Sequence, residues 1–134
     1  MSNTPGFKER AKQNLLSAQF LINKNFYCSS VHCSFYTCLQ TIFHVLFTKK
    51  EINHTRFIAD GKYAGVSSHI QAYKLISNEI ANNDFRNYKW FQKSYTQLKR
   101  LREKADYSTE FIKQEEVYEA FQTATSIISL INKI

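Results

Sequence analysis

The sequence has few of the residues that interrupt regular secondary structure. Three glycines and one proline occur among its 134 residues, and they lie in two short stretches, at residues 5–6 and 61–65. An all-β fold with a turn roughly every 8 to 12 residues needs many more of them, so sandwiches and barrels are disfavoured. With 43% hydrophobic and 15% aromatic residues, disordered and collagen-like classes are excluded as well. The length predicts a single domain over residues 1–134.

Long apolar runs and paired cysteines are also missing. The most apolar stretch, residues 41–47, is far too short to span a bilayer, and the N-terminus has no basic segment followed by an apolar run. Cys28, Cys33 and Cys38 are five residues apart, so on a helix they point in different directions and fit neither a disulfide framework nor a zinc site. Cys28 and His32 share a helix face without further ligands, so we expect no metal and no cofactor. We predict a cytoplasmic protein without membrane contact, with free and mostly buried thiols.

Apolar residues recur with helical spacing in five segments. The predicted helices run from Thr4-Pro5 to about residue 25, from 27 to about 49, from 68 to about 82, from about 89 to 105, and from about 114 onward. Residues 50–66 lose the pattern, which predicts a long loop. Ser68 and Gln71 have the spacing of a capping box. The sequence therefore predicts an all-α fold of about five helices.

The segment 27–49 is apolar around most of its circumference. Two stripes about 100° apart carry the apolar residues: Val31, Phe35, Cys38, Leu39, Ile42, Val45 and Leu46 on one, and Tyr36, Phe43 and Phe47 on the other. Such a helix must be covered on several sides. It is either the central helix of a bundle or a helix shared with a second subunit, and the excess apolar surface predicts a homodimer.

Positive charge is concentrated in residues 84–104, which contain seven basic and two acidic residues. Their net charge is +5, out of +7 for the whole sequence. Aromatic residues such as Tyr95 are interleaved with cations such as Lys99 and Arg100. This mixture can bind phosphates and stack bases. The alternative is a solvated helix face with its aromatics turned to the core, neutralised by the acidic residues of segment 108–119.

The most specific local feature is the pair Arg102 and Asp106, four residues apart, with Tyr95 up to two turns before it. In a functional interpretation Arg102 binds a phosphate and is held in place by Asp106. In a structural interpretation the two form a half-buried ion pair at the end of a helix. The spacing leaves both open, and His69, on an apolar face, is interpreted as a core histidine.

Several motifs in order, over residues 8–132, resemble the HEPN domain family. Residues 29–36 (SSVHCSFY) resemble its Ser- and Tyr-bearing second helix, and residues 68–70 (SHI) its helix start after the central loop. Residues 102–107 (REKADY) are similar to the Arg-x-x-Ala-Asp-Tyr ending of one branch. The resemblance implies an up-and-down helical bundle that forms a homodimer.

Many HEPN proteins are metal-independent ribonucleases with an Arg, four to six residues, and then a His. The His moves a proton at the ribose 2′-hydroxyl, and the Arg stabilises the charge of the phosphorane. Here Asp106 stands where the His is expected, and a carboxyl group beside Arg102 is a poor acid at neutral pH. The resemblance therefore implies a non-enzymatic dimerisation and binding module for a nucleotide, RNA or an acidic partner protein. Its candidate ligand-binding residues are Arg102, Asp106, Tyr107, Arg100, Lys99 and Tyr95, and no catalytic residue is assigned.

Two other functions are consistent with the same sequence. One is a metal-independent HEPN ribonuclease of a toxin–antitoxin or defence system that recruits His69 or His32 across a dimer. The other is a structural module paired with a nucleotidyltransferase-like protein encoded next door.

Overall fold

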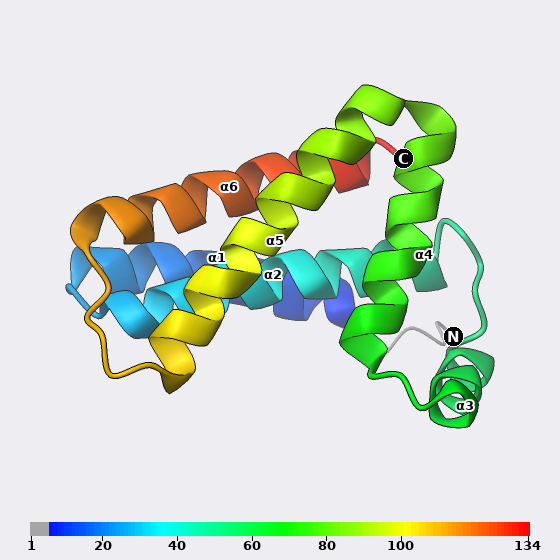
Figure 1. The fold of residues 1–134 in the computed structure, drawn as a ribbon, viewed down its shortest axis with the longest axis horizontal. Coiled ribbons are helices and arrows are strands. Elements are labelled where there is room, and N and C mark those ends of the chain that lie inside the picture. Colours follow the sequence, from blue (N-terminus) through cyan, green and yellow to red (C-terminus); the bar gives the residue numbers. More distant parts are fainter. Residues whose placement is uncertain (1–5) are drawn as a thin grey trace.

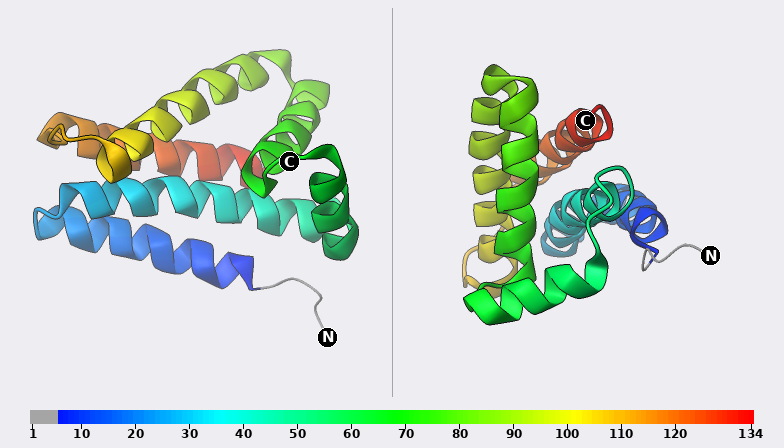
Figure 2. Two further views of the ribbon diagram at one scale, coloured as in Figure 1. Left: turned by 60° about the horizontal axis from the view of Figure 1, so that its bottom comes forward. Right: turned by 90° about the vertical axis from the view of Figure 1, so that its right-hand side faces the viewer.

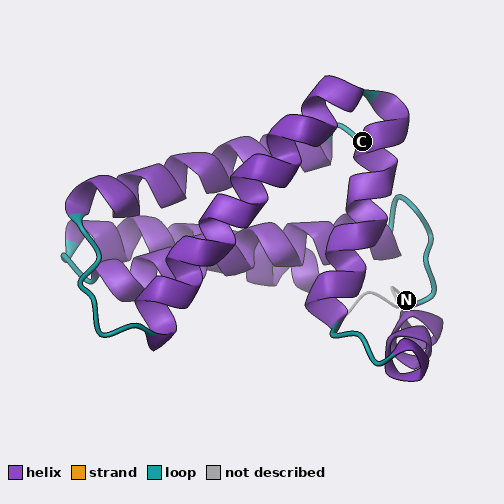
Figure 3. Ribbon diagram, viewed as in Figure 1, coloured by secondary structure: helices purple, strands orange, loops and turns teal. Residues whose placement is uncertain are grey.

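The computed structural model describes residues 6–134, which form six helices and no strand (Figures 1 and 3). The helices are α1 (Phe7–Asn23), α2 (Tyr27–Phe47), α3 (His54–Ala64), α4 (Ser68–Asn83), α5 (Phe85–Tyr107) and α6 (Gln114–Asn132). The predicted all-α bundle is confirmed. None of these helices is both long and apolar enough to cross a membrane. The helix start predicted at Thr4-Pro5 lies outside the described residues.

Helix α2 is the centre of the bundle. It contacts α1, α4, α5 and α6, which surround it in the views of Figure 2. Its first apolar stripe is almost fully buried, from Val31 to Leu46, and Phe43 of the second stripe is 8% exposed. The interpretation of this segment as a central helix is therefore confirmed. The chain's own helices cover the apolar surface from which the dimer was predicted.

A ridge of small hydroxyl residues lets α1 approach α2 closely. The hydroxyl group of Ser30 donates to the carbonyl oxygen of Ala18 at 2.8 Å, and that of Thr37 donates to the carbonyl oxygen of Ala11 at 2.6 Å. All four residues are buried. Small side chains on both helices allow the backbones to approach, and the hydroxyl groups of Ser30 and Thr37 both donate to α1.

Helix α3 occupies the segment that the sequence predicted as a loop. The Asn53 side chain caps it by accepting a hydrogen bond from the Arg56 backbone N–H at 2.9 Å. Phe57 is its one large buried side chain, and its ring meets those of Phe43 and Phe47 edge-on at 6.0 and 5.1 Å. Gly65, with φ of 68°, ends the helix. A single buried apolar residue gives no helical periodicity, which is why the prediction was wrong.

Two other helix starts differ from the predictions. Ser67, not Ser68, caps α4, because its hydroxyl group accepts from the Ile70 N–H at 3.3 Å. Helix α5 begins at Phe85, four residues earlier than predicted, because the Asp84 carboxylate accepts from the backbone N–H groups of the first turn. The start of α6 at Gln114 is confirmed.

The three cysteines are free, but they are not mostly buried. Cys28 is exposed, Cys33 is half-buried and only Cys38 is fully buried. Burial raises the pKa of the Cys38 thiol far above its usual value. The prediction of mostly buried thiols is wrong for Cys28, the second residue of α2.

Candidate functional site

The candidate residues of α5 do not all face the same way. Tyr95 and Arg102, two helical turns apart, are both buried on the face that packs against α2. Lys99 lies on the edge of this face, between α5 and α4. Arg100 instead borders an outer groove with Lys89 and other polar residues of α5 alone. The structure thus separates Arg100 from the other candidate residues.

Arg102 is buried among aromatic rings. Its side chain is 10% exposed, and its Cζ atom lies 5.0 Å from the ring centroid of Phe35 and 5.8 Å from those of Tyr36 and Tyr107. A guanidinium group is weakly hydrated and stacks on rings, so it tolerates this environment better than an ammonium group. Its Nε is buried without a hydrogen-bond partner among the described residues. The guanidinium group is therefore enclosed and not fully satisfied.

Asp106 connects this arginine to a histidine of α2. Its Oδ2 lies 2.8 Å from Nδ1 of His32 and 3.8 Å from a terminal nitrogen of Arg102. The Asp106 side chain is 19% exposed and that of His32 is 46% exposed. The closer partner of Asp106 is thus His32, a contact between residues 74 positions apart that the spacing within α5 did not predict. A carboxylate on one ring nitrogen fixes the orientation of the imidazole and leaves the other nitrogen for solvent or a ligand.

A cavity of about 300 Å³ lies beside Arg102, between α4 and α5, and we call it the α4–α5 pocket. Its aromatic wall is continuous: the ring centroid of Tyr95 lies 5.6 Å from that of Phe35 and 4.9 Å from that of Tyr73. The full lining consists of Phe35, His69, Ile70, Tyr73, Lys74, Tyr95, Thr96 and Lys99. It contains two lysines and no carboxylate. An apolar cavity with a few polar groups at its rim is typical of a small-molecule site.

The electrostatic potential in the α4–α5 pocket is positive. Burial lowers the pKa of His69, and the charges of Arg102 and Lys99 lower it further, so its imidazole is neutral at pH 7. Lys99 has an acidic neighbour, Glu103, but the two charged groups are 4.0 Å apart and about half exposed. Such a pair is weak and leaves the ammonium group accessible to a ligand.

Sequence reasoning found part of this site. It placed Tyr95, Lys99 and Arg102 together but interpreted His69 as a core histidine, whereas its side chain lines the pocket. It missed Lys74 altogether. The available signal was the spacing of His69, Tyr73 and Lys74 on one segment, which places a histidine, an aromatic ring and a cation on neighbouring positions of α4.

Neither metal clusters nor relatives define the site further. Within residues 6–134, no three His, Cys, Asp or Glu side chains are grouped so that they could hold a metal ion. Comparison of the chain with models of protein families, with curated proteins and with solved structures found no match. The chemistry of the α4–α5 pocket and of the cluster around Arg102 therefore carries the functional argument.

Proposed function

We propose that this chain is a non-enzymatic, HEPN-like binding module that takes a nucleotide, free or as part of RNA, into the α4–α5 pocket. The observation that supports this is an aromatic wall next to a basic rim without a carboxylate. Aromatic side chains stack on any base, and lysines bind phosphates through charge. The base would lie against Tyr73, in front of the largely buried ring of Tyr95, with its phosphate between Lys74 and Lys99.

In this proposal the predicted ligand residues have two kinds of role. Lys99 and Tyr95 touch the ligand. Arg102 acts as a positioning residue, because its guanidinium group lies under the ring of Phe35 and contributes to the positive potential at His69. Asp106 holds Arg102 from the other side, and Tyr107, which is 78% exposed, covers the guanidinium group at the end of α5.

Binding of AMP and of a single-stranded RNA oligonucleotide, measured by calorimetry at two salt concentrations, tests the proposal. Replacing Lys99 by Ala should weaken binding about ten- to a hundredfold, since a charge-assisted hydrogen bond contributes roughly 1.5 to 3 kcal/mol. Arg100→Ala is the matched control, because it removes the same charge one residue away on another face of α5. Equal losses for both variants would mean that only net charge matters. If neither AMP nor the RNA oligonucleotide shows salt-sensitive binding, the proposed function is refuted.

A metal-independent ribonuclease is the second candidate function. It is favoured by the pair of Asp106 and His32, because a carboxylate-oriented imidazole beside a buried arginine supplies a general base and a positive charge. The ring centroid of Tyr36 lies 4.6 Å from that of His32 and 5.9 Å from that of His69, so both histidines belong to one cluster of one chain. RNA cleavage in EDTA that is lost in His32→Ala would support this function. Its absence in the wild-type protein would remove it.

The homodimer and the nucleotidyltransferase-like partner remain proposals that the family resemblance supports. The apolar surface of α2 no longer argues for a dimer, since helices of the same chain cover it. Sedimentation at micromolar concentration measures the oligomeric state directly. The proposed partner is tested by asking whether a neighbouring gene encodes a nucleotidyltransferase-like protein.

A further inference from the structure

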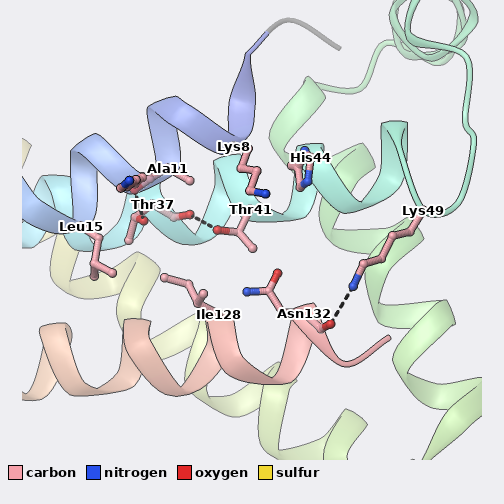
Figure 4. Close-up of a pocket in the computed structure, with 10 residues that line it drawn as sticks. Lys8, Ala11, Leu15, Thr37, Thr41, His44, Lys49, Ile128 and Asn132 are labelled. Atoms are coloured by element: carbon pink, nitrogen blue, oxygen red, sulfur yellow. Dashed lines mark hydrogen bonds between the residues drawn. The ribbon is translucent and has the colours of Figure 1, made fainter. Parts of the chain in front are cut away.

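A second cavity lies on the opposite face of α2. It has a volume of about 400 Å³ and is formed where α1 and α6 both pack against α2 but contact each other little (Figure 4). Residues 37, 41 and 44 of α2 line it, about 120° to 180° around the helix axis from Phe35 of the α4–α5 pocket. The complete lining is Lys8, Ala11, Lys12, Leu15, Thr37, Thr41, His44, Lys49, Ile128 and Asn132. We call it the α1–α6 cavity.

Three lysines line the α1–α6 cavity, and no carboxylate does. Lys8 and Lys12 lie one turn apart on α1, and neither forms an ion pair within residues 6–134. Lys49, beyond the end of α2, donates to the carbonyl oxygen of Asn132 at 2.7 Å, which holds its ammonium group at the mouth of the cavity (Figure 4). Positive charges that line one cavity without a carboxylate attract an anion.

A histidine in the same lining has an unused polar atom. The Nδ1 of His44 is buried and has no hydrogen-bond partner among the described residues. Burial lowers the pKa of His44, and the charges of Lys8 and Lys49 lower it further. By contrast, the hydroxyl groups of Thr37 and Thr41 donate to backbone carbonyl oxygens and are already satisfied. The three lysines, the side-chain amide of Asn132 and this imidazole are therefore the polar groups of the lining that are not already satisfied.

We propose that the α1–α6 cavity binds a small phosphorylated organic molecule. Its phosphate group would lie between the ammonium groups of Lys8, Lys12 and Lys49, within reach of His44. Its apolar part would lie against Leu15 and Ile128, which border the other end of the cavity (Figure 4). The volume is within the range of small-molecule sites. This site is separate from the α4–α5 pocket and does not depend on the proposed function.

Phenyl phosphate and inorganic phosphate are the probes, because they share the charged group and differ in the apolar one. In calorimetry at low salt, phenyl phosphate should bind at least several-fold more tightly than inorganic phosphate. Lys8→Met, which keeps the apolar stem, should weaken phenyl phosphate about tenfold. Lys62→Met is the matched control, since Lys62 lies on α3 outside this cavity, and it should change binding less than twofold. Thermal unfolding of each variant verifies that it is folded.

A second readout places the probe in the cavity. Phenyl phosphate should raise the pKa of His44 measured by NMR, because the anion offsets the repulsion from Lys8 and Lys49. His69, which lines the α4–α5 pocket, is the internal control, and its pKa should not change. Binding that persists in Lys8→Met but is lost in Lys99→Met would place the probe in the α4–α5 pocket and overturn this proposal. Equal affinity for phenyl phosphate and inorganic phosphate would overturn the part of the proposal that places an apolar group of the ligand in the cavity.

Discussion

Replacing Asp106 by Asn removes the carboxylate that pairs with Arg102. The Arg102 side chain is 10% exposed and lies among three aromatic rings, so water cannot replace the lost partner. The new amide keeps the shape of the carboxylate and can still accept a hydrogen bond from His32. The variant therefore isolates the charge of Asp106 from its packing.

The structure sets the expected size of this effect. Leaving a buried charge without its partner costs about 3 to 5 kcal/mol of stability. The separation of 3.8 Å and the 19% exposure of the Asp106 side chain reduce the interaction. The cation–π contacts that remain with Phe35, Tyr36 and Tyr107 also offset part of the loss, at roughly 0.5 to 1 kcal/mol each. We therefore expect Asp106→Asn to lower the free energy of unfolding by about 2 kcal/mol.

Urea unfolding followed by far-UV circular dichroism at pH 7 measures this loss, and a double-mutant cycle assigns it. In an Arg102→Met background no buried cation remains, so Asp106→Asn should cost less than about 0.5 kcal/mol, the usual range for a substitution without a broken contact. Equal costs in the two backgrounds would refute the reasoning, since they would show that Asp106 does not neutralise Arg102. A loss below about 0.5 kcal/mol in the wild-type background would show that solvent reaches the guanidinium group.

Three further predictions follow from single features. The pKa values of His44 and His69 are lower in the folded protein than the ordinary 6.5, so the unfolded chain binds more protons below that value. The midpoint of thermal unfolding should fall from pH 7 to pH 5.5, and the fall should be smaller in His44→Asn; an unchanged midpoint would contradict this. A Cβ at Gly61 would collide with Oε1 of Gln71 and would lie 3.3 Å from the backbone carbonyl oxygen of Val66, so Gly61→Ala should destabilise the wild type and should cost less in a Gln71→Ala background, as urea unfolding will measure. Native protein should react rapidly with a thiol reagent at Cys28 alone, and a fast phase that survives Cys28→Ser would show that another thiol is accessible.

The helices that the sequence predicted best are those that bury a long periodic face. Helix α2 buries twelve of its 21 residues, and its pattern indicated a central helix before any partner was known. Helix α6 begins at the predicted residue because Glu116 reaches back to the Lys113 N–H at 2.9 Å, a local signal within the same turn. The sequence did not predict helix α3, because Phe57 is its only large side chain in the core and its N-cap residue, Asn53, adds nothing to a periodic pattern.

The candidate site was predictable only where its residues share a helix. The spacing of Arg102 and Asp106 placed them on one flank of α5, as the structure has them. The contact from Asp106 to His32 depends on the angle at which α5 crosses α2, and no local pattern encodes that angle. The same holds for Lys74, which reaches the pocket only because α4 folds back beside α5.

The sequence left two interpretations of the basic residues open: a phosphate-binding surface, or a solvated helix face that nearby acidic residues neutralise. The distribution of charge in the structure bears on this choice. The acidic residues after α5 could have neutralised the basic helix as a whole, but their contacts are with Lys104, which lies 3.0 Å from Glu116 and 3.6 Å from Glu110. The lysines that line the two cavities make no comparable pair: the α1–α6 cavity has no carboxylate in its lining, and Lys99 has only a half-exposed neighbour at 4.0 Å. Part of the excess positive charge therefore borders the two cavities, on exposed or half-exposed lysines, while Lys89, Lys93 and Arg100 lie along the outer groove of α5. Nearby positive charges add to burial in lowering the pKa of a histidine in each cavity, and a bound anion would offset the part that is due to charge.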